Sequence, residues 1–278
     1  MNKRDITGIA GSYGLAPNKR LGQNFLADDG IASKIISVIS PSLDDDIIEV
    51  GPGLGALTEP LSRGCRSLTA VEIDSGLCRY LTERFAGYKN VRIEHADFLK
   101  YSAPDLYTKA VSNLPYYCAS SILFKMALAL KKAGLYVMLQ KEMAERISAP
   151  PGGKEYGALT VTLAYYYNAK IAFNVPREVF YPRPDVASAF VKLERREETL
   201  SAAENILFHT IVKSSFWGRR KTIFRALVSS PHLSFDKDQI RNALELAGID
   251  EKTRGEEYGV DKYCLLARLL AAGTNGKD

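Results

Sequence analysis

Cysteine and histidine are scarce in this sequence, and neither residue type forms a group. The four cysteines lie far apart without a Cys-x-x-Cys pair, and the three histidines are equally scattered. Disulfide frameworks, zinc sites and iron–sulfur clusters all need paired or closely grouped residues. We therefore expect reduced thiols, no metal site and no metal-dependent chemistry.

Long apolar runs are also missing. No segment approaches the roughly 20 apolar residues that a membrane-spanning helix needs. The opening Met-Asn-Lys-Arg-Asp is not followed by the apolar core of a signal peptide. The sequence thus predicts a cytoplasmic protein without membrane contact.

Neither sign of charge dominates the chain. Its 278 residues include 37 Lys and Arg against 32 Asp and Glu, and its apolar content is that of an ordinary globular protein. This mild basic excess permits a polyanionic partner without requiring one. The length allows one large domain and a smaller one.

What the sequence does contain is a regular alternation of short apolar strands and helices. Asp28 has the position of a helix N-cap, and Gly64 has that of a helix end. Such alternation predicts a parallel sheet covered on both faces, with ligands bound beyond the carboxyl ends of its strands. The predicted strands are 47–50, 68–73, 91–94, 110–112 and 135–139, and the predicted helices are 28–39, 54–64, 75–85, 122–130 and 141–147.

The pattern changes in the last part of the chain. Residues 158–167 and 187–193 are joined by a proline-rich connection, and we expect them to pair as antiparallel strands. A charged junction at 195–198 is followed by helical patterns, which places a domain boundary near residue 198. The helices predicted there are 202–212, 236–247 ending at Gly248, and 261–272 ending at Gly273. We therefore expect domains over residues 1–198 and 199–278.

A glycine-rich turn follows the first predicted strand. In Glu-Val-Gly-Pro-Gly-Leu-Gly, which begins at Glu49, the glycines let a ligand approach the backbone closely. Glu72 ends the next strand, 21 positions after Gly51, and its carboxylate can accept hydrogen bonds from both hydroxyls of a ribose. Both features would also suit a nicotinamide-dependent dehydrogenase, so they indicate a nucleotide-type ligand and no particular reaction.

Two further strand ends separate these classes. Taken singly, an acidic residue such as Asp97 could be a helix N-cap or a solvated loop carboxylate. Here Asp97 ends the strand after Glu72 and offers an acceptor to an adenine amine, and Asn113 opens Asn-Leu-Pro-Tyr one strand later. The Asn113 oxygen and the Leu114 carbonyl can accept both hydrogens of an exocyclic amine, and the Tyr116 ring offers a face to the base. A transferase that delivers methyl to an amine needs this arrangement, whereas a dehydrogenase does not.

With these strand ends in register, the sequence resembles the class I S-adenosylmethionine-dependent methyltransferases. That resemblance implies an α/β fold with a Rossmann-like, doubly wound, seven-stranded sheet that ends in an antiparallel strand, here followed by a small all-α C-terminal domain. Six segments narrow the resemblance to the small-subunit ribosomal RNA adenine N6,N6-dimethyltransferases, from about residue 19 to the end of the chain. They are 19–26 (Lys-Arg-Leu-Gly-Gln-Asn-Phe-Leu), 113–117, 139–142, 180–184 followed by 188–190, 218–222 and 254–258.

The narrower resemblance implies roles for particular residues. S-adenosyl-L-methionine would be the cofactor, with S-adenosylhomocysteine as its product and no metal. Asn113, with the Leu114 carbonyl, would orient the target amine, and Tyr116 would stack on the base. The implied cofactor contacts come from Asn24, Leu26, Gly51, Glu72, Asp97 and Asn113.

Positive residues gather between 213 and 225, with Phe216 and Trp217 among them and no acidic residue. This composition suits phosphate contacts combined with base stacking. A solvated helix face around a core tryptophan would have the same composition. The candidate RNA-binding residues are Lys19, Arg20, Arg219, Arg220 and Lys221.

The function implied by the resemblance is methylation of N6 on two adjacent adenines in the 3′-terminal hairpin loop of small-subunit (16S) ribosomal RNA. The product would be N6,N6-dimethyladenosine, formed during ribosome biogenesis by a monomer acting on the RNA or on a pre-30S particle. One alternative is a large-subunit (23S) ribosomal RNA adenine methyltransferase of the macrolide-resistance type, against which residues 19–26 and 219–222 argue. Another is a non-catalytic RNA-binding assembly factor, against which Asp97, Asn113 and Tyr116 argue.

Overall fold

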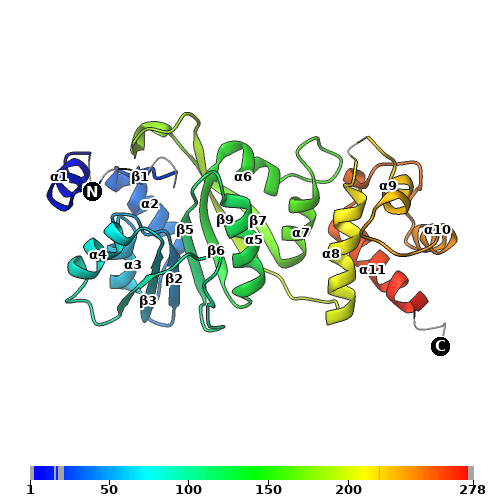
Figure 1. Ribbon diagram of the computed structural model, residues 1–278, viewed down its shortest axis with the longest axis horizontal. Coiled ribbons are helices and arrows are strands. Elements are labelled where there is room, and N and C mark those ends of the chain that lie inside the picture. The colour runs from blue at the N-terminus through cyan, green and yellow to red at the C-terminus, as the bar shows by residue number, and fades with distance from the viewer. Residues whose placement is uncertain (1–2, 16, 18–21, 219, 275–278) are drawn as a thin grey trace. The chain divides into compact units, whose positions relative to one another are not determined.

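The computed structural model describes residues 3–15, 17, 22–218 and 220–274 and contains a seven-stranded sheet (Figure 1). The order of its strands is β4-β3-β2-β5-β6-β9-β7. A second, two-stranded sheet joins β1 (Phe25–Leu26) to β8 (Phe180–Tyr181). The strands of the large sheet are β2 (Asp46–Val50), β3 (Ser67–Glu72), β4 (Val91–His95), β5 (Lys109–Asn113), β6 (Gly134–Gln140), β7 (Tyr167–Val175) and β9 (Ser188–Arg195).

The sheet is doubly wound, as the sequence predicts. Strands β4, β3, β2, β5 and β6 run parallel, whereas β9 is antiparallel to β6. The order of the strands along the chain reverses between β2 and β5, and a reversal of this kind opens a crevice at the carboxyl ends of the strands. The architecture therefore places a ligand site beyond the last residues of β2 to β5.

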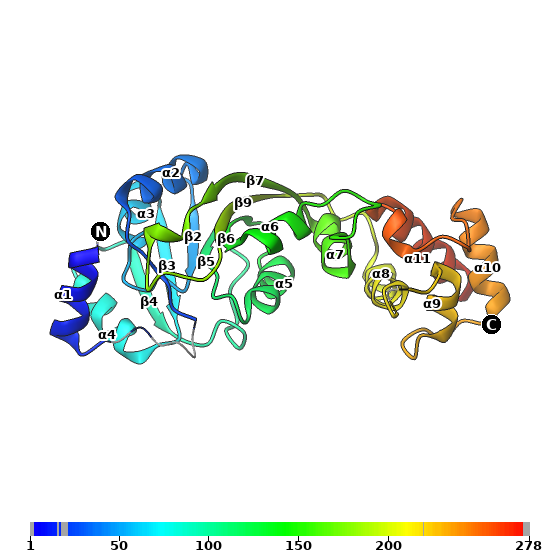
Figure 2. The same cartoon turned by 90° about the horizontal axis from the view of Figure 1, so that it is seen from above.

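Apolar packing fixes the helices that cover the sheet. Helix α2 begins after Asp28, whose Oδ1 accepts a hydrogen bond from the Ile31 amide at 2.8 Å. Its buried Ile35 and Ile39 pack with Leu61 and other apolar side chains in one core cluster. Figure 2 shows α2 and α5 on opposite sides of the sheet. The helices here are α2 (Asp29–Ile39), α3 (Thr58–Gly64), α4 (Ser75–Arg84), α5 (Ala119–Ala129) and α6 (Lys141–Ile147), with the 3-10 turn η2 (Arg177–Val179).

An additional helix, α1 (Lys3–Tyr13), was not predicted. Its Ile6 is fully buried in a cluster with Leu54 and Leu77, both of which also line the pocket described below. The ring of Tyr13 meets that of Tyr80 edge to face at 5.0 Å. Helix α1 thus supports the glycine-rich turn from outside.

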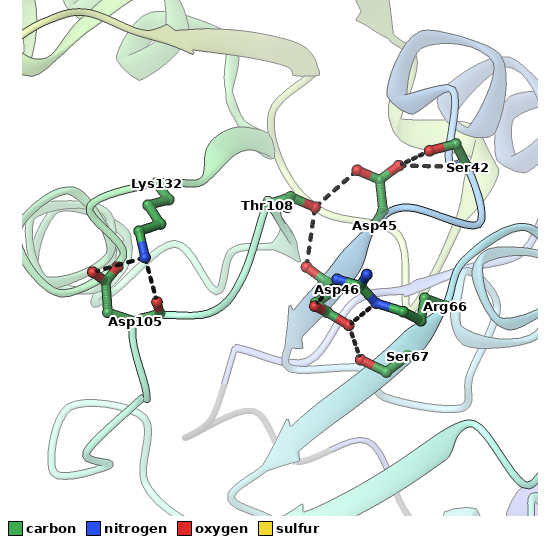
Figure 3. Close-up of polar contacts among 8 residues, drawn as sticks. All are labelled: Ser42, Asp45, Asp46, Arg66, Ser67, Asp105, Thr108 and Lys132. Atoms are coloured by element: carbon green, nitrogen blue, oxygen red, sulfur yellow. Dashed lines mark hydrogen bonds and ion pairs between the residues drawn. The ribbon is translucent and has the colours of Figure 1, made fainter.

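Polar contacts tie the strands together at their amino ends (Figure 3). Thr108, before β5, donates to Asp45 Oδ1 at 2.8 Å, and Lys109 Nζ donates to Asp45 Oδ2 at 2.7 Å. Arg66 Nε donates to Asp46 Oδ1 at 3.0 Å. These contacts satisfy the charges at the end of the sheet that lies away from the ligand crevice.

The expected strand over residues 158–167 is wrong. Residues 158–166 form helix α7 (Ala158–Tyr166), and the strand beside β9 is β7, which begins at Tyr167. The helix carries apolar side chains all round and buries most of them. Such a run lacks the one-sided period of a surface helix, and its threonines and valine favour a strand. Tyr165 of this helix is buried, with its ring 4.9 Å from that of Phe208.

The C-terminal residues form the predicted helical region. Ser201 caps α8 through a reciprocal pair of bonds with Glu204, and Asp236 caps α10. Helix α11 continues through Gly273, so the expected helix end at that glycine is wrong. A glycine costs an exposed helix only about 1 kcal/mol and does not by itself end it. The elements are α8 (Ala202–Ser215), α9 (Ile223–Ser229), α10 (Lys237–Leu246), the 3-10 turn η3 (Gly255–Glu257) and α11 (Val260–Thr274).

The chain packs into two compact units. The sheet unit comprises the described residues of Met1–Ala144 and Ala169–Arg195, and the helical unit comprises those of Glu145–Asn168 and Arg196–Asp278. The helical unit therefore takes in α7, which precedes the predicted domain boundary at residue 198. No helix among the described residues has the length and apolarity to cross a membrane.

Candidate active site

A pocket of about 360 Å³ lies in the sheet unit at the carboxyl ends of β2 to β5. It brings together the eight residues that the sequence predicts for the cofactor and the target base, while their individual roles remain predictions. They are Asn24, Leu26, Gly51, Glu72, Asp97, Asn113, Leu114 and Tyr116.

The glycine-rich turn leaves room for a ligand at its first glycine. Gly51 has φ +71°, and a Cβ built on it would meet no atom within 4 Å. Its amide donates to the Val71 carbonyl at 2.9 Å, which anchors the turn to β3. Gly53 differs, because a Cβ there would lie 3.1 Å from the ring of Phe25 in β1. The turn thus presents bare backbone to the pocket at Gly51 and contacts β1 at Gly53.

Glu72 points a carboxylate into the pocket from the end of β3. Its two oxygens accept hydrogen bonds from the amides of Gly53, at 3.2 Å, and Asp74, at 3.0 Å. Burial raises the pKa of Glu72 to about 7, and the two amide bonds oppose that rise. A carboxyl group has lone pairs beyond these two bonds, which suits it to hydroxyl donors from a ligand.

A second carboxyl group, Glu49, lines the same pocket and was not predicted as a site residue. It accepts a hydrogen bond from the Thr58 hydroxyl at 2.6 Å, and 3% of its surface is exposed. Burial, with a smaller contribution from the charge of Glu72, raises the pKa of Glu49 to about 7. The signal in the sequence is an acidic residue inside the apolar run Ile47–Val50 of β2, where a charge without a partner would be costly.

Asp97 follows β4 and shapes the loop at its end. Its Oδ1 accepts a hydrogen bond from the Leu99 amide at 2.9 Å. Ile73 and Leu99 line the pocket beside Glu72 and Asp97 and are 47% and 41% exposed. Together they give this part of the pocket apolar surfaces beside two carboxyl groups.

Asn113 ends β5 and is held in one orientation. Its Nδ2 donates to the backbone carbonyl of Asn24 at 2.9 Å. A carbonyl can only accept, so the amide nitrogen must face Asn24 and Oδ1 is left as an acceptor. The Leu114 amide donates to the Met138 carbonyl at 3.1 Å, which anchors the following turn to β6.

Tyr116 is held in place by a contact with β9. Its hydroxyl lies 3.0 Å from the hydroxyl of Ser188, which is fully buried at the start of that strand. Burial also raises the pKa of Tyr116, so its phenol is neutral at ordinary pH. Ser188 was known from the sequence only as part of a family segment, because its partner lies 72 positions away.

The candidate RNA-binding residues are only partly described. Lys19, Arg20 and Arg219 lie outside the described residues. Arg220 and Lys221 precede α9 in the helical unit, where Lys221 Nζ donates to the Ser229 hydroxyl at 2.7 Å.

The two aromatic residues of the same segment have different surroundings. The Phe216 ring stacks on Tyr263 at 6.3 Å and belongs to the packing of the helical unit. The Trp217 side chain is 44% exposed, with its ring 5.3 Å from that of His232. Trp217 is therefore the accessible aromatic of the pair.

Metal ligands are not grouped in the described part of the chain. No three His, Cys, Asp or Glu side chains lie close enough there to hold an ion.

Comparisons with known proteins all identify ribosomal RNA methyltransferases as relatives of this chain. The model of the family described as ribosomal RNA adenine dimethylase matches residues 14–272. The ribosomal RNA small subunit methyltransferase A of Anoxybacillus flavithermus is 40% identical over 274 residues, which cover 94% of this chain and 93% of the relative. That of Listeria monocytogenes is 38% identical over 277 residues, covering 95% and 94%.

Solved structures share the fold. A dimethyladenosine transferase from Plasmodium falciparum superposes with a TM-score of 0.77 at 24% identity, covering 91% of this chain and 98% of that one. The 23S rRNA methyltransferase ErmE gives a TM-score of 0.69 at 26% identity, covering 89% and 100%.

Proposed function

Because this chain belongs to the ribosomal RNA adenine dimethylase family, we propose that this pocket is where it methylates adenine N6 of small-subunit ribosomal RNA. The predicted family and enzyme class are confirmed: the chain is an S-adenosylmethionine-dependent ribosomal RNA adenine dimethyltransferase. Its 40% identity to small-subunit enzymes over nearly the whole length favours that RNA, against 26% to a 23S enzyme. The proposed target is two adjacent adenines of the 3′-terminal hairpin loop.

The pocket fits S-adenosylmethionine, which supplies an electrophilic methyl group on a sulfonium. Gly51 offers backbone that a ligand can approach, since no atom fills the space where a Cβ would lie. Glu72 would accept hydrogen bonds from the ribose hydroxyls, because two backbone amides already hold its carboxyl group in place. Asp97 would accept a hydrogen bond from the amine of the cofactor's adenine. Ile73 and Leu99 would pack against that adenine ring. Asn24, just before β1, and Leu26, in β1, would close the pocket on that side.

The orientation of the Asn113 amide is the observation that carries the proposal for the target base. Its Nδ2 is bound to the Asn24 carbonyl, so Oδ1 and the Leu114 carbonyl are the acceptors for the two hydrogens of N6. The adenine nitrogen is a weak nucleophile because its lone pair is delocalised into the ring. Holding both hydrogens aims that lone pair for in-line attack, and such orientation can supply several kcal/mol of the barrier. Each transfer forms a nitrogen–carbon bond, breaks the carbon–sulfur bond and releases one proton from nitrogen.

Tyr116 would hold the base itself. A target adenine must leave its stack to enter the pocket, at a cost of a few kcal/mol that is smaller in a loop than in a duplex. The ring of Tyr116, fixed through Ser188, gives the base a replacement surface. Arg220 and Lys221 would contact RNA phosphates from the helical unit. We further propose a monomer that acts in the cytoplasm on the RNA or on a pre-30S particle.

Methyl transfer with labelled S-adenosylmethionine tests the substrate. Unmethylated small- and large-subunit RNAs and particles are incubated with the protein, and the modified base is mapped. Label on adenine N6 in the small-subunit hairpin loop is expected. Label confined to large-subunit RNA contradicts the proposed target, and label in neither RNA supports a non-catalytic role.

Replacing Asn113 tests the mechanism. We expect Asn113→Ala to lower the single-turnover rate of methyl transfer by about 100-fold or more, because the amine loses one acceptor and is no longer oriented for attack. RNA binding, measured by filter retention, should stay within about twofold, since phosphate contacts supply most RNA affinity. Asn174→Ala, at an exposed position of β7, is the matched control. A fully active Asn113→Ala variant would exclude the assigned role.

A further inference from the structure

Tyr117 is an exposed aromatic residue at the mouth of the pocket. Its side chain is 62% exposed, although it lines the same pocket as Asn113 and Tyr116. Among the described residues, Tyr117 and Trp217 are the aromatic side chains that stand out as exposed, and Trp217 belongs to the helical unit. Single exposed apolar residues are common on protein surfaces, so it is the position of Tyr117 at this pocket that sets it apart.

The Tyr117 side chain is supported along one edge. Gly22 has φ +59°, and a Cβ there would lie 3.3 Å from Tyr117 Cδ1 and 3.5 Å from Pro115 Cβ. The Cδ1–Cε1 edge of the ring therefore rests against Gly22, while most of the ring remains in solvent. The backbone beneath it is fixed by Pro115 and by the Cys118 amide, which donates to the Pro115 carbonyl at 3.3 Å. The ring is held in place without being buried.

Among the described residues, three exposed large apolar side chains line the pocket, and they divide into two groups. Ile73 directly follows Glu72 and Leu99 lies two residues after Asp97, so the nucleoside of the cofactor would account for their exposure. Tyr117 instead follows Tyr116, on the side of the proposed target base. On that side an RNA loop offers an aromatic surface that could cover the Tyr117 ring, namely the base next to the target.

We propose that Tyr117 is the binding site for the nucleobase adjacent to the adenine being methylated. This inference rests on the proposed function. When the target adenine leaves its stack, its neighbour loses a stacking surface, and an exposed aromatic ring replaces that surface for any base. Tyr117 directly follows Tyr116 and lines the same pocket, so its ring is available to a base next to the one that Tyr116 would hold. Stacking needs the ring of Tyr117 and not its hydroxyl.

Substitutions that keep or remove the ring test this site. Tyr117→Phe should bind and methylate small-subunit RNA like the wild type. Tyr117→Leu keeps an apolar side chain but loses the aromatic face, and it should raise KM for the RNA by roughly 5- to 150-fold. Affinity for S-adenosylhomocysteine, measured by calorimetry, should be unchanged in both variants. Leu43→Ala, 74% exposed before β2 at the other end of the sheet, is the control for loss of surface apolarity.

A fluorescent base reports stacking directly. A synthetic hairpin RNA carries 2-aminopurine beside the target adenine, and its emission is measured on binding. Wild type and Tyr117→Phe should change the emission in the same way, and Tyr117→Leu should not. Equal emission changes and equal KM values for wild type and Tyr117→Leu would overturn the inference while leaving methylation intact. A wild-type protein that methylates no small-subunit RNA would contradict the proposed function itself.

Discussion

At the scale of single residues, partners distant in the chain determine how the pocket side chains are held. The sequence could place Glu72, Asp97 and Asn113 because each follows a recognisable strand, and the ends of parallel strands meet. It could not assign Ser188 to Tyr116, since that contact depends on the antiparallel return of β9. Glu49 was overlooked because a strand residue inside a glycine motif gives no sign of which way it faces.

The buried carboxyl group of Glu49 should make the stability of the protein depend on pH. Its pKa is raised from 4.5 to about 7, so the folded state favours the protonated form. The stabilisation that follows is complete below pH about 4.5 and is lost as pH rises through about 7. Glu49→Gln keeps an acceptor for Thr58 and removes the charge. Relative to wild type, its free energy of unfolding should therefore increase between pH 5 and 8, by up to about 3 kcal/mol.

Urea unfolding of the cofactor-free protein at pH 5 and pH 8 measures this change. Glu245→Gln, at an exposed position of α10, controls for the substitution itself. A difference between Glu49→Gln and wild type that is the same at both pH values would contradict the prediction.

At the scale of elements, the sequence predicts the type and bounds of a helix or strand best where one side of that element is polar. Helices α2 and α10 have a capping Asp and an apolar stripe, and both were placed within a few residues. Helix α7 was mistaken for a strand because it is buried on all sides, so that tertiary packing decides its conformation. Helix α1 was missed because its core contact depends on Ile6 meeting residues of α4.

Gly51 and Gly53, two of the three glycines in the turn after β2, should respond differently to replacement. Both have positive φ, so alanine should cost each about 1–2 kcal/mol of stability. Gly51→Ala adds a methyl group where no protein atom lies within 4 Å, so its further effect should be weaker binding of S-adenosylhomocysteine. Gly53→Ala pushes against Phe25 and should destabilise the protein more. Thermal unfolding and calorimetry separate these effects.

Gly87→Ala is the control, because a Cβ there meets nothing and its φ is ordinary. Equal stability losses for Gly51→Ala and Gly53→Ala would argue against the contact with Phe25.

At the scale of the whole molecule, the alternation of strands and helices predicted the sheet, and the change of pattern after it predicted the helical region. The predicted boundary at residue 198 stays a prediction, while the compact helical unit also includes α7. That inclusion has a physical cause in the packing of Tyr165 against Phe208 and of Tyr166 against His209, contacts that link residues about 43 positions apart. Composition near residue 198 could not reveal them.

Charge in the helical unit should govern the salt dependence of RNA binding. The Arg220→Glu/Lys221→Glu variant should bind small-subunit RNA more weakly. Its plot of log affinity against log salt should be shallower by about 1 to 2, because each lost phosphate contact removes about 0.7 to 0.9 from the slope. Lys131→Glu/Lys132→Glu changes the net charge equally, before β6 at the end of the sheet away from the pocket. An unchanged slope in the first variant would show that these residues do not contact phosphate.

The hydrogen bond from Asn113 to Asn24 also bears on where the reaction stops. On the proposed roles, two fixed acceptors face an amine that begins with two hydrogens. Each transfer replaces one hydrogen by a methyl group, so after the second the amine has none left to donate. Two acceptors in the pocket then lose their partners, at a cost of about 1–3 kcal/mol each. The two acceptors that orient the amine therefore also favour release of the dimethylated base. Methylation ends when N6 has no hydrogen left to donate.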